Sequence, residues 1–100
     1  MSWKVLDKLV TKTIKDKFPE QIDEVILSQD DFGEYNGRRL LDTRIIVVLK
    51  KYDDIKYEDE IKDYIKTIER TVFNEYLGGK SHITFAMRDN WYLLFICQTL

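Results

Sequence analysis

The segment YLGGKSHITF, residues 76–85, contains a glycine pair followed by Lys80 and Ser81, the residues with which a phosphate-binding loop ends. A P-loop needs Gly, four residues and then Gly-Lys-Ser/Thr, placed between a strand and the N-terminus of a helix whose free N–H groups hold the phosphate. Here Asn74 occupies the first glycine position, and the predicted order is helix, glycine pair, strand. Two glycines at this point are typical of the left-handed turn that ends a helix. The sequence therefore predicts a helix C-cap, and we expect no bound nucleotide or other cofactor.

His82 and Cys97 are the only histidine and cysteine in the chain, and a hairpin over the last twenty residues would place them opposite each other. An imidazole beside a thiol can make it a nucleophile. However, the sequence identifies no third group to orient the imidazole and no oxyanion donor, and buried cysteines are frequent structural residues. One His and one Cys are also too few for a structural zinc site. We therefore expect no catalytic residue here.

Four acidic residues cluster around the predicted turn of an earlier hairpin and could offer oxygen ligands to Mg²⁺ or Ca²⁺: Asp30, Asp31, Glu34 and Asp42. The ligand spacing of an EF-hand is absent. Arg38, Arg39 and Arg44 lie within cross-strand reach of these carboxylates, which favours a network of surface ion pairs. We expect no metal site.

A basic ridge is predicted on the N-terminal helix, where four lysines fall on neighbouring turns opposite the apolar stripe: Lys4, Lys8, Lys12 and Lys15. Such a ridge could follow a phosphate backbone. A solvated helix face looks the same, and the chain has a formal net charge of −2. Nucleic-acid binding is therefore the alternative function and not the leading one.

Two helices are predicted from apolar residues that recur at helical spacing. The first runs from Ser2, which can cap it, to Phe18, since Pro19 forbids its continuation. The second runs over residues 57–77 and carries three acidic residues, 58–60, in its first turn, where the helix dipole favours negative charge.

Two hairpin turns are predicted, at Asn36-Gly37 and at Asp89-Asn90. The first pairs Tyr35 with Arg38, and in an uninterrupted register it also sets Asp31 against Asp42. Because like charges directly opposed are unfavourable, a bulge or a wider loop around residues 30–33 is the alternative. The second turn pairs Phe85 with Leu94.

The predicted fold is an α+β two-layer sandwich formed by residues 1–100 as a single domain. Its element order is α-β-β-α-β-β, with a four-stranded antiparallel sheet in the order 1-2-4-3 and two helices on one face. The second and fourth strands carry the most continuous apolar runs, which favours central positions for them.

An interface is predicted on the sheet face that the helices leave uncovered, since both faces of the second hairpin are apolar. We expect the helices to cover the set Ile83, Phe85, Met87, Tyr92, Leu94 and Ile96. Trp91, Leu93 and Phe95 would then face outward, beside either Ile46 and Val48 or Ile45, Val47 and Leu49. An exposed patch of this kind usually marks an interface, and the alternative is that a terminus or Trp3 covers it. The predicted interface residues are Trp91, Leu93, Phe95 and Val47.

A chain of 100 residues supports one domain with a modest core. Its longest apolar runs, residues 45–49 and 91–97, are far shorter than the roughly 18 residues of a membrane helix. Charged residues interrupt the apolar N-terminus, so the pattern of a secretory signal is absent. We expect an intracellular, cytoplasmic protein that does not contact a membrane.

Together these features predict a non-enzymatic protein–protein interaction module that forms a homodimer or binds another protein through the open sheet face. A module of this size without a catalytic signature is often a small regulator or assembly protein of a phage, plasmid or virus. That expectation rests on size and not on any residue.

Overall fold

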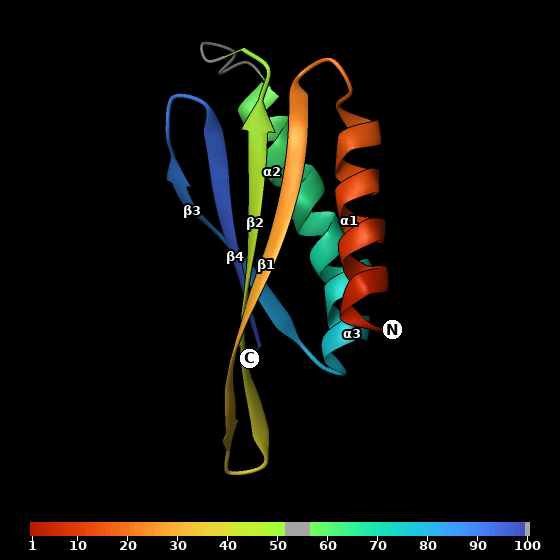
Figure 1. The fold of residues 1–100 in the computed structure, drawn as a ribbon, viewed down its shortest axis with the longest axis vertical. Coiled ribbons are helices and arrows are strands. Elements are labelled where there is room, and N and C mark those ends of the chain that lie inside the picture. The colour runs from red at the N-terminus through yellow and green to blue at the C-terminus, as the bar shows by residue number, and fades with distance from the viewer. Residues whose placement is uncertain (52–56, 100) are drawn as a thin grey trace.

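A computed structural model describes residues 1–51 and 57–99, without the side chains of residues 38, 39 and 99. Its elements are α1 (Trp3–Lys17), β1 (Ile22–Tyr35), β2 (Arg38–Leu49), α2 (Glu58–Ile68), the π-helical η2 (Glu69–Phe73), α3 (Asn74–Leu77), β3 (Ser81–Arg88) and β4 (Tyr92–Thr99). The strands form one antiparallel sheet in the order β1-β2-β4-β3, and the helices lie on one side of it (Figure 1). The predicted fold class, element order and strand order are confirmed.

Helix α1 begins and ends where the sequence predicts. The Ser2 side chain caps it by accepting a hydrogen bond from the Val5 N–H, which satisfies one of the free donors of the first turn. The buried residues Leu6, Val10 and Ile14 face the sheet. Leu9 belongs to the predicted apolar stripe but is 42% exposed.

The second helix contains a π-helical turn that the apolar periodicity does not reveal. Residues 58–77 form one run of α2, η2 and α3, in which η2 is the π segment. Ile68 and Phe73 are both buried although they stand five residues apart, which is the spacing of a π turn. Val72, which α-helical spacing would bury, is only partly buried.

From Ser81 to Phe85 the second hairpin is paired one residue away from the predicted register, and beyond the bulge the difference is two residues. The prediction sets Phe85 opposite Leu94, whereas the structure pairs Phe85 with Phe95. The chain turns through a wider loop in which the Asp89 N–H donates to the Tyr92 carbonyl. Because side chains alternate along a strand, a shift of one residue turns the whole of β4 over.

The predicted orientation of β4 is therefore wrong. Leu93 and Phe95 are 0% and 2% exposed and belong to the core between sheet and helices, as does Val47 on β2. The face away from the helices receives Tyr92, Leu94 and Ile96 from β4. Of the two sets considered on β2, the outward one is Ile46 and Val48.

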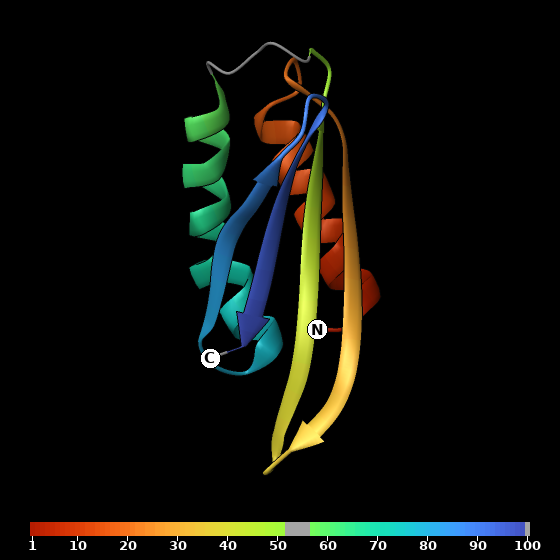
Figure 2. The same cartoon turned by 90° about the vertical axis from the view of Figure 1, so that its left-hand side faces the viewer.

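The first hairpin has the predicted turn, and it contains a bulge, which is the alternative to the uninterrupted register. Tyr35 pairs with Arg38, and the register shifts between Asp31 and Glu34. The bulge moves Asp30, in place of Asp31, opposite Asp42. Toward the Asn36-Gly37 turn, the last residue of β2 that pairs with β4 is Asp42. The part of the first hairpin beyond Asp42 therefore projects from the sheet as a two-stranded arm (Figure 2).

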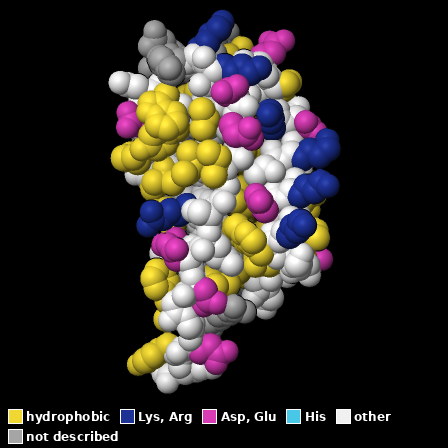
Figure 3. Space-filling view, viewed as in Figure 1, with side chains coloured by type: hydrophobic (Ala, Val, Ile, Leu, Met, Phe, Trp, Pro, Cys, Tyr) yellow, Lys and Arg dark blue, Asp and Glu magenta, His cyan; other side chains and the backbone are white. Residues whose placement is uncertain are grey.

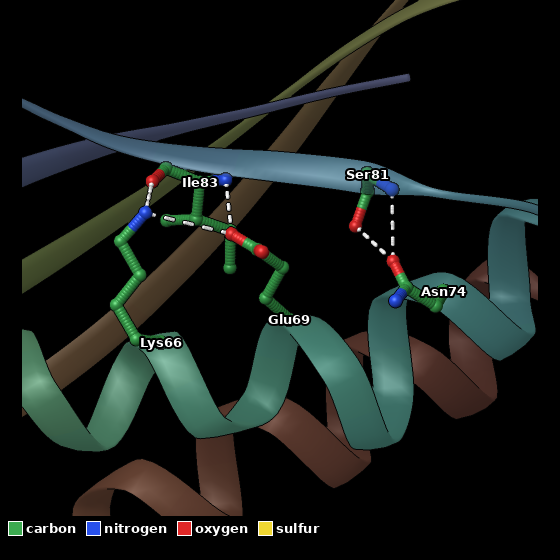
Figure 4. A network of polar contacts seen from close by, with 5 residues as sticks. All are labelled: Lys66, Glu69, Asn74, Ser81 and Ile83. Atoms are coloured by element: carbon green, nitrogen blue, oxygen red, sulfur yellow. Dashed lines mark hydrogen bonds and ion pairs between the residues drawn. The ribbon is translucent and has the colours of Figure 1, made fainter. Parts of the chain in front are cut away.

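The edge of the sheet at β3 is closed by side chains from the second helix (Figure 4). Glu69 accepts a hydrogen bond of 2.6 Å from the Ile83 N–H, and the Lys66 ammonium donates to the Ile83 carbonyl. At the start of the strand, Asn74 Oδ1 accepts from both the N–H and the hydroxyl of Ser81. These bonds occupy backbone groups that an edge strand otherwise offers to another chain.

We predict that Glu69→Ala destabilises the fold by about 1–3 kcal/mol, because the buried Ile83 N–H loses its acceptor. Glu69→Gln retains an oxygen acceptor and serves as the matched control, with a smaller loss. Urea denaturation followed by circular dichroism measures both variants. Equal stability of Glu69→Ala and the wild type would contradict the assigned role of this carboxylate.

Candidate interaction surface

The sheet face opposite the helices carries an apolar row that crosses all four strands. Ile26 on β1 pairs with Ile46 on β2, Ile46 with Leu94 on β4, and Leu94 with Met87 on β3. The two ends of the row, Ile26 and Met87, are 47% and 43% exposed. The register shift between Phe85 and Met87 places Met87 on this face, whereas Phe85 stays packed against the core. A β-bulge has thus moved one apolar side chain outward.

Further apolar side chains extend the row into a patch. Val48 pairs with Tyr92 on one side of it, and Ile96 lies on the other side, beside Arg44. Trp91 is 48% exposed, and its ring lies edge-on to that of Tyr92 with centroids 4.6 Å apart. Figure 3 shows a contiguous group of hydrophobic side chains over this part of the sheet. We call this set of residues the open-face patch: Ile26, Ile46, Val48, Met87, Trp91, Tyr92, Leu94 and Ile96.

A polar row bounds the open-face patch toward the arm. Asp30 pairs with Asp42, Asp42 with Gln98, and Gln98 with His82. The two carboxylates thus stand on β1 and β2, and the amide and the imidazole stand on β4 and β3. One oxygen of Asp42 lies 3.9 Å from Arg44 Nη2. The other, Oδ1, is covered and accepts no hydrogen bond from the described part of the chain.

The four predicted interface residues do not lie on the same face of the sheet. Only Trp91 is exposed, whereas Leu93, Phe95 and Val47 are buried in the core. The alternative cover by Trp3 does not apply, since Trp3 packs against Tyr76 on the helical layer with ring centroids 6.5 Å apart. The described residues leave an apolar face on the sheet, but apart from Trp91 other residues form it.

His82 and Cys97 do not come together. Cys97 pairs with Ile83, and His82 pairs with Gln98, so the thiol points to the core and the imidazole to the open face. Burial raises the pKa of the Cys97 thiol to about 11 from 9.0, and a hydrogen bond with the Ser81 side chain acts in the opposite direction. This thiol is a poor nucleophile at neutral pH.

The glycine pair ends the second helix, as predicted. Gly78 has a left-handed φ of 69° at the helix C-cap, a backbone conformation that favours glycine. The N–H of Gly79 donates to the Asn74 carbonyl. The loop therefore follows a helix C-terminus, where carbonyl groups and not N–H groups are free, so it lacks the helix N–H groups that hold a phosphate in a P-loop.

The acidic cluster does not converge on one point. Asp31 Oδ1 accepts from the Gly33 N–H within the bulge, and Asp42 faces Arg44. Among the described residues, no group of three or more His, Cys, Asp or Glu side chains could hold a metal ion. The contact between Asp42 and Arg44 lies along β2 and not across the hairpin as expected. The side chains of Arg38 and Arg39 lie outside the described residues.

The basic ridge keeps its exposed lysines but shares them with acids. Lys4, Lys8, Lys12 and Lys15 are all exposed on α1. Lys12 Nζ lies 2.5 Å from Asp16 Oδ2, and Lys15 Nζ lies 3.9 Å from Glu24 Oε2. Partial neutralisation of two of the four lysines weakens the field that a phosphate backbone would meet.

One hollow lies at the edge of the open-face patch. It has a volume of about 260 Å³ and is lined by Asp23, Val48, Leu49, Lys50 and Trp91. Sites for drug-sized molecules typically occupy roughly 300–1,000 Å³ and are closed on most sides. A flat apolar face with a small hollow beside it suits a protein surface better than a small molecule.

Comparison with known proteins adds no identity: no family model, curated protein or solved structure matches this chain. Within the described residues, no helix has the length and apolarity needed to cross a membrane.

We predict that Cys97 is unreactive in the folded protein. A pKa of about 11 in place of 9.0 lowers the thiolate fraction near pH 7.5 by about 100-fold, and burial also blocks access. Alkylation with iodoacetamide should be slow in buffer and fast in denaturant, and the native rate should rise only as the pH approaches 11. Equal rates with and without denaturant would contradict the buried placement of this thiol.

Proposed function

We propose that this protein is a non-enzymatic interaction module that associates with another protein, most simply a second copy of itself, through the open-face patch. The observation that carries the proposal is the apolar row from Ile26 to Met87, which crosses the whole sheet on the side without helices. A contiguous apolar patch on a small protein costs free energy in water, and such patches usually mark interaction sites.

Burial of the apolar sheet face would supply the free energy of association. Burying apolar surface contributes about 25 cal/mol per Å², and a standard interface buries about 800 Å² on each partner. A four-stranded sheet offers a surface of that order, because strands lie about 4.8 Å apart and rise about 3.4 Å per residue. The open-face patch also contains a Trp and a Tyr, which are frequent hot-spot residues in interfaces.

We predict that Ile26→Lys and Met87→Lys each weaken self-association at least about tenfold, since each buries an unpaired ammonium in the interface. Leu9→Lys is the matched control, because Leu9 is an apolar residue of similar exposure (42%) on α1. Sedimentation equilibrium gives the dissociation constants, and circular dichroism checks that each variant folds. If Leu9→Lys weakens association and the other two do not, the interface lies on the helical layer.

Nucleic-acid binding through the basic ridge is a second candidate, favoured by the exposure of all four lysines on one helix. It requires retention of the protein on DNA or RNA at low salt, with a steep fall as salt rises. The loss of retention in a Lys4→Glu, Lys8→Glu variant would support this candidate. Absence of binding at low salt would remove it.

A further inference from the structure

We infer that the partner on the open-face patch is a second copy of this chain, related by a two-fold axis that runs parallel to the strands between β2 and β4. In this arrangement the two sheets pack face to face, and β2 of each copy lies on β4 of the other. The inference rests on the proposed function and adds the identity and orientation of the partner.

The apolar row is complementary to itself under this rotation. The axis keeps every residue at its own height along the strands and exchanges β2 with β4 and β1 with β3. Ile46 then meets Leu94 of the second copy, and Ile26 meets Met87 of the second copy. On one neighbouring row Val48 meets Tyr92, and on the other the Arg44 side chain meets Ile96. Apolar side chains therefore meet apolar side chains across the whole row, as in the packed layers of a β-sandwich.

The polar row indicates how the second copy is oriented relative to the first. Its hydrogen-bond acceptors, Asp30 and Asp42, occupy β1 and β2, and its side chains with N–H donors, His82 and Gln98, occupy β3 and β4. The rotation sets Asp30 opposite His82 of the second copy and Asp42 opposite Gln98. Carboxylates thus face donors and do not face each other, which is the complementarity that fixes register in an interface.

The competing two-fold axis, perpendicular to the strands, lays each strand on its own copy. Centred on the apolar row, it sets Ile26 on Ile26 and Met87 on Met87. The polar row of one copy then no longer faces the polar row of the other copy, so Asp30 loses the donor that His82 offers. The same apolar residues would be buried, but the match between acceptors and donors would be lost.

Thiol cross-linking distinguishes the two arrangements. Ile26→Cys and Met87→Cys are mild changes at exposed sites, and the native Cys97 is buried and unreactive. The parallel axis places residue 26 over residue 87 of the second copy. It leaves residues 26 of the two copies displaced laterally by about 14 Å, three strand spacings. We therefore treat each variant alone, and an equal mixture of the two, with a short bismaleimide, and resolve the products on a denaturing gel.

The inference predicts about tenfold more cross-linked dimer in the mixture than in either variant alone, because the facing thiols have a high effective concentration. The wild type is the control and should give none. Cross-linking of each variant with itself would overturn the parallel axis and leave the open-face interface intact. No cross-linking in any sample, at concentrations where the mass has doubled, would overturn both the arrangement and the open face as the interface.

Discussion

Two helical segments can cover only one face of a four-stranded sheet, and most features of this protein follow from that constraint. The covered face holds the large core residues, among them Phe73, Phe95 and Leu93, which are almost completely buried. The other face also carries apolar side chains on its two central strands, because β2 and β4 are apolar on both sides. We propose that the apolar area on this face binds a partner.

Side chains of the second helix protect the edge of the sheet at β3. On β3 the backbone groups of Ile83 are occupied by Lys66 and Glu69, and those at the start of the strand by Asn74. Pairing of this edge with another chain would require these bonds to break. The π turn contributes to the arrangement, because it changes the helical spacing between Ile68 and Phe73 and lies where Glu69 reaches the strand. Association through the face leaves all of these bonds in place.

Much of the architecture can be predicted from the sequence, because its signals are local and strong. The Ser2 cap, the Asn36-Gly37 turn and the Gly78 C-cap each depend on a residue suited to one backbone conformation. Strand order follows from the apolar runs of β2 and β4. The first hairpin contains a bulge, but the bulge sets Asp30 opposite Asp42, so it does not separate the like charges that suggested it.

The membership of the site could not be predicted in the same way, because it depends on a register that differs by one residue. Both faces of β4 are apolar, so hydrophobic alternation does not distinguish the orientation with Leu93 inward from the one with Leu94 inward. The wider turn before Tyr92 and the bulge before Met87 decide it. Neither has a strong sequence signal: Asp89-Asn90 suits a tight turn as well as a wide one. The π turn is hidden for a similar reason, since Val72 and Phe73 are both apolar and either could face the core.

The most direct test of the central claim is the molar mass of the wild-type protein in solution, measured by light scattering over a wide range of concentrations. Association through the uncovered face predicts a mass that rises with concentration from 12.0 kDa and levels off at about twice that value, as a closed two-fold dimer requires. A mass that stays at 12.0 kDa at every concentration would contradict self-association. A mass that rises without limit would contradict the closed dimer, because only an open contact continues to add copies.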